Sequence, residues 1–361
     1  MQILFLNSIG KNKWGGGEKW MLMAAKGLEE KGHTVIVGCA KNSIIGKNAK
    51  AKNLITENVS FNSDIDFLGF LRLKRVIKKY NISHIICGQN KDTKISSIAA
   101  LGNKNIKVIA RHGLQVISKK LKYKIFFKNL IDGIITNSKT IKEEYETYNW
   151  FPEDFIKVIY NGVEIPEIEK IEPIDIHKLL SLPEKTKTIL SAGRLAKQKG
   201  YDTLIKTANL AKKQNKNWHF VVIGKGKLEK KLKREVTKLE LSEYITFLGF
   251  QKNVLSFMKE TDIFVLPSLY EGMPNAVLEA MSIGKCCITS NVNGNKELIS
   301  NGKDGILVEP NRPKELFLEI DKIFSDADLK NKIEKNAHLK ISTNFTIDRM
   351  VKLTEEYLLS L

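Results

Sequence analysis

The sequence of 361 residues has no long apolar segment and very little cysteine. No run of about eighteen apolar residues occurs, so we expect no transmembrane helix. The first residues lack the basic region of a signal peptide and are typical of a strand. The four cysteines show no Cys-x-x-Cys spacing, and two of them, Cys286 and Cys287, are adjacent. We therefore expect neither a disulfide framework nor a zinc site, and a reducing cytoplasm fits this composition.

Acidic residues are outnumbered by basic ones, with 40 Asp and Glu against 59 Lys and Arg and a net charge of +19. Such an excess is typical of proteins that bind nucleic acid, anionic lipid or a phosphorylated substrate. The lysines are spread over the whole chain, however. Outside residues 119–131 they do not gather with aromatic residues as a nucleic-acid surface requires. We therefore expect no nucleic-acid partner, and charge alone does not choose among the other partners.

The length exceeds that of one ordinary core and predicts two domains. Short apolar runs alternate with helical patterns, which predicts an α/β protein with parallel sheets covered by helices. These runs are residues 2–8, Thr34–Cys39, His84–Cys87, Val108–Ala110 and Gly133–Thr136, then Thr188–Ala192, Phe220–Ile223, Thr246–Phe250 and Ile263–Leu266. Between the two groups, residues 164–186 are rich in Glu, Pro and Ile without periodicity, and we place the linker there.

A turn and a helix follow the apolar run Ile263–Leu266. Gly272 and Pro274 break the chain, proline suits the first turn of a helix, and Gly284 is a natural stop. A strand, a tight turn and a helix start together present free backbone N–H groups, which bind anions. The sequence therefore predicts an anion site where this helix begins.

Two carboxylates flank that site. Glu271 lies in the turn, and Glu279 lies about one helical turn, roughly 6 Å, beyond Asn275. Most glutamates on short helices are simply solvated, which is the ordinary alternative. A diphosphate bound at the helix start would have one glutamate near each of its ends.

Two cations follow the strand expected at Thr188–Ala192, in the segment Gly193–Gly200. A departing nucleoside diphosphate gains negative charge, so a site that releases it needs cations. Arg194 can fork across phosphate oxygens, and Lys199 can act as a point charge. Solvated side chains are again the ordinary alternative.

The segment from Glu271 to Glu279, with seven residues between its two glutamates, resembles the donor-site motif of retaining glycosyltransferases of family 4. The resemblance implies the B-type glycosyltransferase fold (GT-B): two Rossmann-like parallel-sheet domains facing a cleft, with a C-terminal helix crossing back to the first. Residues 1–164, joined by 343–361, would form an acceptor domain. Residues 165–342 would form the domain that binds a nucleotide-sugar donor.

The resemblance also implies roles for single residues. Glu271 would hold the transferred sugar and Glu279 the ribose, while Arg194 and Lys199 would clamp the diphosphate, so that no metal is required. His112, after the strand expected to end at Ala110, is similar to the active-site histidine of the family. The further donor-binding candidates are Gly16, Gly17, Glu18, Gly193, Gly224, Phe250, Gly272, Met273, Pro274 and Asn275.

Two features depart from the family pattern or compete with it. Asn293 stands where the family usually has the first of two glycines, which leaves the contacts of that loop open. Asp64-Ile65-Asp66 and Asp326-Ala327-Asp328 match the metal-binding pair of the other glycosyltransferase fold. Neither adjoins the glutamate motif, so we expect both to be structural and the site to hold no metal.

The sequence thus predicts a cytoplasmic retaining glycosyltransferase that moves a sugar from a nucleotide-diphosphate sugar to a cell-envelope glycan or a lipid-linked acceptor. Lysines and aromatic residues crowd residues 119–131, which favours contact with an anionic membrane surface on the inner face of the cell membrane. An ordinary helix with a solvated basic side is the alternative. A nucleotide-sugar epimerase or phosphorylase of the same fold, and a polyanion-binding protein, remain alternative functions.

Overall fold

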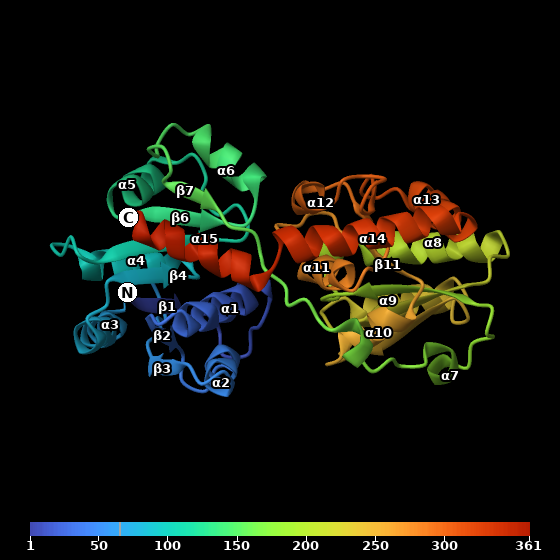
Figure 1. The fold of residues 1–361 in the computed structure, drawn as a ribbon, viewed down its shortest axis with the longest axis horizontal. Helices are drawn as coiled ribbons and strands as arrows, with labels where there is room; N and C mark the ends of the chain where they lie inside the picture. The colour runs from blue at the N-terminus through green and yellow to red at the C-terminus, as the bar shows by residue number, and fades with distance from the viewer. Residues whose placement is uncertain (65) are drawn as a thin grey trace. The chain divides into compact units, whose positions relative to one another are not determined.

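The computed structural model describes residues 1–64 and 66–361, and the chain forms two compact units (Figure 1). Unit 1 comprises Met1–Gly162 and Ile347–Leu361, and unit 2 comprises Val163–Thr346. The chain thus leaves unit 1 slightly earlier than the expected residue 164 and returns slightly later than residue 343. The reason is a parallel bridge between Val163 and Thr346, supported by a 2.8 Å hydrogen bond from Val163 N–H to Phe345 O, which keeps both segments in unit 2.

Unit 1 is built on a seven-stranded sheet in the order β3-β2-β1-β4-β5-β6-β7, and every strand pair is parallel. The strands are β1 Gln2–Asn7, β2 Thr34–Cys39, β3 Ile55–Asn58, β4 His84–Cys87, β5 Lys107–His112, β6 Gly133–Thr136 and β7 Ile156–Val158. Parallel strands buried on both faces are nearly continuous apolar runs, which is why most of them are visible in the sequence. The short strand β3 carries polar residues and was not predicted.

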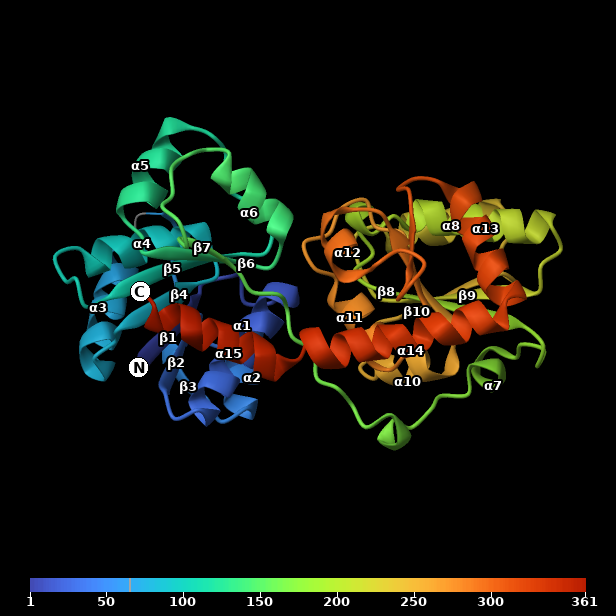
Figure 2. The ribbon, with the colours of Figure 1, turned by 45° about the horizontal axis from the view of Figure 1, so that its top comes forward.

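Helices cover both faces of this sheet (Figures 1 and 2). Leu4 and Leu6 of β1 share one core with α3, α4, α5 and α6, while Ile3 and Phe5 share another with α1, α2 and α15. This division follows from the two-residue period of a strand. The helices are α1 Gly16–Glu30, α2 Ile44–Ala51, α3 Phe67–Tyr80, α4 Asn90–Ala100, α5 Leu121–Asn129, α6 Lys139–Glu146 and α15 Ile347–Leu359.

Unit 2 has a six-stranded parallel sheet in the order β10-β9-β8-β11-β12-β13. Its strands are β8 Lys187–Ala192, β9 Trp218–Ile223, β10 Ile245–Gly249, β11 Ile263–Leu266, β12 Cys287–Ser290 and β13 Ile306–Val308. Its helices are η1 Ile168–Lys170, α7 Ile176–Leu180, η2 Lys197–Lys199, α8 Tyr201–Lys213, α9 Glu229–Lys238, α10 Val254–Glu260, α11 Asn275–Ser282, α12 Asn293–Leu298, α13 Pro313–Ser325 and α14 Ala327–Asn344. Two parallel, helix-covered sheets confirm the expected fold class.

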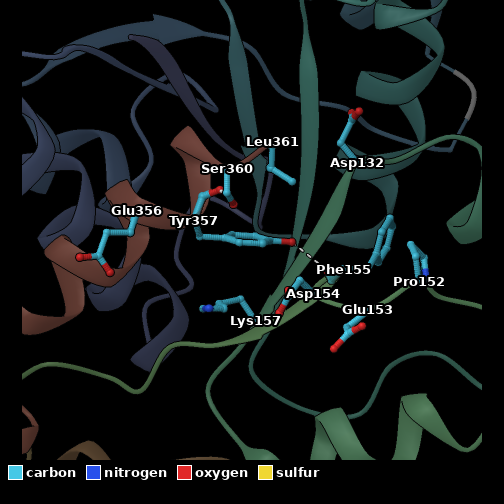
Figure 3. Close-up of a pocket in the computed structure, with 10 residues that line it drawn as sticks. All are labelled: Asp132, Pro152, Glu153, Asp154, Phe155, Lys157, Glu356, Tyr357, Ser360 and Leu361. Carbon is cyan, nitrogen blue, oxygen red and sulfur yellow. Dashed lines mark hydrogen bonds between the residues drawn. The ribbon is translucent and has the colours of Figure 1, made fainter.

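The last helix, α15, returns to unit 1, as expected, and packs on α1. The two helices lie so close at Gly27 that an added Cβ would meet Val351 Cγ2 at 2.3 Å. Near the C-terminus, the Tyr357 hydroxyl donates a 2.7 Å hydrogen bond to Phe155 O (Figure 3). A pocket of about 420 Å³ lies beside this bond, where β6 and β7 begin. Open parallel sheets bind ligands at the opposite, carboxyl ends of their strands.

Candidate functional site

In unit 2, the loops that follow β8, β9 and β10 are joined backbone to backbone. Gly193 N–H donates to Ile223 O at 2.9 Å, and Gly224 N–H donates to Gly249 O at 2.7 Å. Gly224 has φ +144°, and an added Cβ would lie 1.9 Å from Gly193 O. Only glycine fits there. The contact between neighbouring loops therefore explains the glycine at position 224 without any ligand.

The structure brings Lys199 and Glu271 together from segments far apart in the chain. Lys199 Nζ lies 2.6 Å from Glu271 Oε1, which also accepts a 2.6 Å hydrogen bond from the Ser268 hydroxyl. The Glu271 side chain is only 6% exposed and that of Lys199 17%. A carboxylate this deeply buried must be paired, and the lysine and the hydroxyl satisfy it. A positive and a negative group thus stand side by side where β11 ends.

Arg194 is exposed and connects to the same loop through Gln198, a residue that the sequence did not single out. Arg194 Nη2 donates to Gln198 Oε1 at 3.4 Å, and Gln198 Nε2 donates to Tyr270 O at 3.0 Å. Leu269 N–H donates to Gln198 O at 2.7 Å. Gln198 therefore fixes the Arg194 loop against the residues that precede Glu271. The position of Gln198 in the sequence, between Arg194 and Lys199, was the feature that could have identified it.

Helix α11 begins at Asn275, and Pro274 is its N-cap, not part of its first turn as expected. Pro274 O accepts hydrogen bonds from the N–H groups of the next turn, as an N-cap carbonyl does. The predicted stop is confirmed, because Gly284 has φ +73° and its N–H donates to Met281 O at 3.0 Å. Gly272, Met273 and Pro274 are buried, and Asn275 and Glu279 are partly exposed.

The segment around Asn293 forms the short helix α12, where the sequence suggested a loop. Gly294 N–H donates to Glu271 O at 3.2 Å, and an added Cβ would lie 1.8 Å from Gly272 O. Asn293 itself is exposed. The second position of the family's glycine pair therefore needs glycine for packing, while the first position accommodates Asn293. After β10, Phe250 is 64% exposed.

In unit 1, His112 is the last residue of β5, which extends two residues beyond the expected end at Ala110. Its ring is 4% exposed and meets Phe127 and Tyr145 edge to face. Burial, together with the charge of Arg111, lowers the pKa of His112 to about 3, so the ring is neutral at physiological pH.

The tautomer of His112 follows from its hydrogen bonds. The Tyr145 hydroxyl accepts from the N–H groups of Val116 and Ile117 at 3.0 and 3.3 Å, and it lies 3.3 Å from His112 Nδ1. Because this hydroxyl has one proton, it donates that proton to Nδ1, and the ring proton resides on Nε2. Nε2 is buried and has no hydrogen-bond partner among the described residues. His112 thus presents an unused N–H donor.

Arg111, which the sequence analysis did not identify, lies beside His112 in a buried polar cluster. Its guanidinium lies 4.9 Å from the centroid of the Trp20 ring, and its Nη2 donates to Asn161 Oδ1 at 3.2 Å. Asn137 Nδ2 donates to the same oxygen at 3.3 Å. Burial lowers the pKa of Arg111 to about 10, which leaves it charged at neutral pH. This cluster could have been found from the sequence by one feature: Arg111, Asn137 and Asn161 all lie at or just beyond the carboxyl ends of strands.

The glycine-rich segment lies at the start of α1, next to Arg111. Gly16 is the first residue of the helix, and an added Cβ on Gly17 would lie 3.4 Å from Arg111 Nη1. Glu18 is buried, and its Oε1 accepts a 3.2 Å hydrogen bond from Asn7 Nδ2, at the end of β1. The negative charge of Glu18 favours the charged form of Arg111. The structure therefore brings Gly17, Glu18, Arg111 and His112 to one edge of the sheet.

A second buried acid of unit 1, Asp92, was also missed. Its Oδ2 accepts from Ser8 N–H at 3.0 Å, and its Oδ1 accepts from the Ser8 hydroxyl. Burial raises the pKa of Asp92 to about 7. It could not be predicted from the sequence, because an isolated Asp in the first turn of a helix is common.

Residues 119–131 contain helix α5, whose aromatic and aliphatic residues face different ways. Phe127 is buried against His112, whereas Leu121 and Ile125 are 70% and 55% exposed. The expectation that aromatic side chains point outward with the lysines is therefore wrong for Phe127, which completes the core. Among the described residues, no helix is long and apolar enough to cross a membrane.

The two Asp-x-Asp segments have structural roles in the described residues. Asp66 caps α3 by accepting Gly69 N–H at 2.7 Å, and Asp326 caps α14 by accepting Leu329 N–H at 2.9 Å. Asp64 forms an ion pair with Lys94, and Ile65 lies outside the described residues. Within the described ranges, no group of three or more metal-binding side chains occurs. The absence of a metal requirement stays a prediction.

Comparison with known proteins assigns both units to glycosyltransferase families. Residues 174–340 match the model described as Glycosyl transferases group 1, and residues 14–166 match Glycosyltransferase Family 4. An uncharacterized glycosyltransferase of Methanocaldococcus jannaschii is 30% identical over 79% of this chain and 69% of its own length. The chain therefore belongs to the group 1 and family 4 glycosyltransferases, which confirms the resemblance seen in the sequence.

Two further matches concern a named enzyme and a solved structure. The UDP-Gal:alpha-D-GlcNAc-diphosphoundecaprenol alpha-1,3-galactosyltransferase of Escherichia coli is 35% identical over 56% of this chain, and the match spans only 54% of that enzyme. The structure of Anabaena HepE in complex with UDP and glucose superposes with a TM-score of 0.85, at 20% identity over 100% of both chains. The latter likeness confirms the GT-B fold.

Proposed function

We propose that this protein transfers a sugar, with retention of anomeric configuration, from a nucleotide-diphosphate sugar to a hydroxyl of a glycan or a lipid-linked acceptor. The observation that carries the proposal is the buried Lys199–Glu271 pair, 2.6 Å apart, beside the loop of Arg194. A diphosphate needs cations, and a sugar ring needs acceptors for its hydroxyl groups. The pair offers both at the junction where phosphate and sugar meet.

In this proposal unit 2 binds the donor. Arg194, Lys199 and the backbone N–H groups at the start of α11 stabilise the diphosphate as its charge grows. Glu271 accepts hydrogen bonds from the transferred sugar, and Glu279 binds the ribose. Phe250, exposed after β10, stacks on the base. The leaving group is thus stabilised by the protein's own cations.

Retention is proposed to occur by front-face attack. Glu271 is held by Lys199 and Ser268, which makes it a poor covalent nucleophile. The acceptor oxygen instead bonds to the anomeric carbon as the bond to the diphosphate breaks. The acceptor proton passes to the departing phosphate oxygen. His112, neutral and with a free Nε2–H, donates a hydrogen bond to the sugar and does not take up that proton.

The named relatives support the choice of substrates to test first. The Escherichia coli enzyme uses UDP-Gal and a diphosphoundecaprenol-linked acceptor, as its name says, and HepE was solved with UDP and glucose. We propose a cytoplasmic enzyme that works at the inner face of the membrane, where α5 contacts anionic lipid through Leu121, Ile125 and neighbouring lysines. A same-fold epimerase would consume the donor without any acceptor, and a phosphorylase would require phosphate.

The test combines binding and turnover. Thermal shifts against a panel of nucleoside diphosphates identify the base, since a ligand stabilises the state that binds it. Transfer is then measured with the matching donor and a lipid-linked acceptor. Arg194→Ala should lower the transfer rate about 100-fold or more, while Lys197→Ala, at a neighbouring exposed position, should have little effect. Donor turnover in the absence of acceptor and phosphate would contradict transfer.

A further inference from the structure

Arg111 is a buried charge of unit 1 for which the proposed donor chemistry has no use. The residue is 8% exposed, and its pKa of about 10 keeps it positively charged at neutral pH. A guanidinium has five N–H groups. Among the described residues, the one hydrogen bond of Arg111 runs from Nη2 to Asn161 Oδ1 at 3.2 Å, and Nε has no partner. No carboxylate of the described ranges forms an ion pair with it.

Glu18 acts on Arg111 only from a distance, because it already has other neighbours. Its Oε1 accepts from Asn7 Nδ2 at 3.2 Å, and an added Cβ on Gly15, the N-cap of α1, would lie 3.4 Å from its Oε2. A glutamate in the first turn balances the positive end of its own helix. The face of the Trp20 ring, 4.9 Å from the guanidinium, attracts a cation but carries no opposite charge. Arg111 therefore has no counterion of its own among the described residues.

The unpartnered atoms around Arg111 are of both kinds. Among the described residues, Arg111 Nε and Trp20 Nε1 are donors without a partner, and Asn137 Oδ1 is an acceptor without one. Arg111 and Asn137 lie together, because Nη2 and Asn137 Nδ2 donate to the same oxygen of Asn161. A buried water would satisfy hydrogen bonds but would leave the charge unbalanced. An anionic group with a neighbouring hydroxyl satisfies both needs.

Arg111 lies near the carboxyl end of β5, at the edge where open parallel sheets bind ligands. Two glycines flank its Nη1, since an added Cβ would lie 3.4 Å from this atom on Gly17 and 2.6 Å from it on Gly113. The guanidinium thus lies against backbone at both positions. The adjacent ring of His112 is neutral at physiological pH. Arg111 is therefore the charge that an anionic ligand would meet here.

We infer that Arg111 binds a carboxylate or phosphate group carried by the sugar acceptor, and that Asn137 accepts a hydrogen bond from a neighbouring hydroxyl of that sugar. The inference rests on the proposed function, in which unit 2 binds the donor and unit 1 the acceptor. Arg194 and Lys199 serve the donor diphosphate there, which leaves the cation of unit 1 for the acceptor. The sequence analysis gave the neighbouring glycine-rich segment to the donor, and the experiment separates the two assignments.

The experiment measures the binding of matched sugars to the full chain by calorimetry, without donor. Glucose, galactose and N-acetylglucosamine are each supplied as the 1-phosphate and as the methyl glycoside. The methyl glycosides of glucuronate and galacturonate test a carboxylate in place of a phosphate. Arg111→Met removes the charge at similar size, and Arg111→Lys restores it. Arg75→Met, at an exposed position of α3, is the matched control, and Arg194→Met disables the donor site.

We expect the wild type to bind at least one anionic sugar about tenfold or more tightly than the neutral partner. Arg111→Met should lose this preference, by roughly 10- to 100-fold, as expected for lost hydrogen bonds to a charged group. Arg111→Lys should regain part of it. Arg75→Met and Arg194→Met should keep it, and thermal unfolding checks that each variant is folded.

Three results would overturn the inference. The first is equal binding of anionic and neutral sugars by the wild type, which decides even if Arg111→Met does not fold. The second is an unchanged preference in Arg111→Met. The third is loss of the preference in Arg194→Met, which would place the sugar phosphate in the donor site.

Nucleoside diphosphate binding is measured separately by thermal shift. If Arg111→Met lost this binding and kept the sugar preference, the anion at Arg111 would belong to the donor and the inference would be wrong. A wild type that binds no nucleoside diphosphate would contradict the proposed function instead. The sugar preference is read without donor, so the two failures are distinguishable.

Discussion

The two units treat their buried polar groups differently. In unit 2, Glu271 has Lys199 and Ser268 as partners, and the buried polar atoms without partners among the described residues are hydroxyls and the Asn295 amide oxygen. In unit 1, the unpartnered atoms include Arg111 Nε and His112 Nε2. A buried donor without a partner costs about 1–3 kcal/mol. The buried charge of Glu271 thus has its partners within unit 2, whereas in unit 1 nitrogen donors of Arg111 and His112 have no partner among the described residues.

The two units also differ in what surrounds their glycines. In unit 2, three glycines approach other backbone atoms so closely that an added Cβ would come within 2 Å of a carbonyl oxygen: Gly200, Gly224 and Gly294. In unit 1, the glycines near the polar cluster meet only side chains, such as Arg111 beside Gly17 and Gly113. At these positions a side chain is excluded by backbone in unit 2, whereas the neighbours in unit 1 are side chains.

The largest effect is expected from Lys199→Met, which breaks the internal pairing of unit 2. The variant removes a cation that stabilises the leaving diphosphate, so transfer should fall about 10³-fold. It also leaves Glu271 buried without a charge partner, which should cost about 3–5 kcal/mol of stability. Steady-state transfer and chemical unfolding measure the two effects, with Lys197→Met as the exposed control.

A second variant separates these two roles of Lys199. Lys199→Met/Glu271→Gln has no unpaired charge, so we expect most of the stability to return while transfer stays well below that of Glu271→Gln alone. If transfer returned together with stability, Lys199 would act only by supporting the fold. The proposed contrast between the two units would then lose its functional meaning.

The backbone contrast is tested by Gly224→Ala. The variant combines φ +144° with a Cβ 1.9 Å from Gly193 O, so it should destabilise unit 2 by about 3 kcal/mol and weaken donor binding. Gly102→Ala in unit 1 is the control, since Gly102 has φ +83° but open space around its Cβ. That substitution should cost only about 1 kcal/mol. Equal losses of unfolding free energy would show that φ, and not the loop contact, makes glycine necessary.

The glutamate segment of unit 2 could be located from the sequence, whereas the polar cluster of unit 1 could not, for a physical reason. The residues from Glu271 to Glu279 form one continuous segment, so local pattern was enough to locate it. Arg111, Asn137 and Asn161 come from three strand ends, and only the sheet brings them together. The short strand β3 has few apolar residues to reveal it.

Side-chain direction was a second limit of prediction. The pattern of α5 does not show that Phe127 turns inward to His112, because both sides of that helix carry apolar residues. The exposed apolar side of α3 was hidden in the same way. Its sequence reads as an ordinary amphipathic helix until the buried side is known.

The polar cluster of unit 1 should also show in the pH dependence of stability. His112 has a folded pKa of about 3, below its unfolded value of about 6.5. As the pH falls from 7 to 5, the unfolded state takes up a proton that the folded ring does not. This group alone should therefore remove about 2 kcal/mol of stability over that range.

Asp92 acts in the opposite direction. Its folded pKa of about 7 is above its unfolded value, so its contribution is present at low pH and is lost as the pH rises from 5 to 7, by about 2 kcal/mol. The two effects should nearly cancel in the wild type. His112→Asn should be more stable at pH 5 than at pH 7, and Asp92→Asn less stable. The measurement is the free energy of unfolding at both pH values. The same pH dependence in the wild type, His112→Asn and Asp92→Asn would refute the pKa shifts assigned to these two residues.

The smallest expected effect, that of Tyr357→Phe, tests whether α15 stabilises unit 1. Tyr357→Phe removes the hydrogen bond to Phe155 O and should cost about 1 kcal/mol. Tyr244→Phe in unit 2, whose ring packs on the core of that unit, is the control and should cost little. If the two units unfold in separate transitions, only that of unit 1 should shift with Tyr357→Phe. A shift in the transition of unit 2 would mean that α15 stabilises unit 2. The division into two units would then need revision.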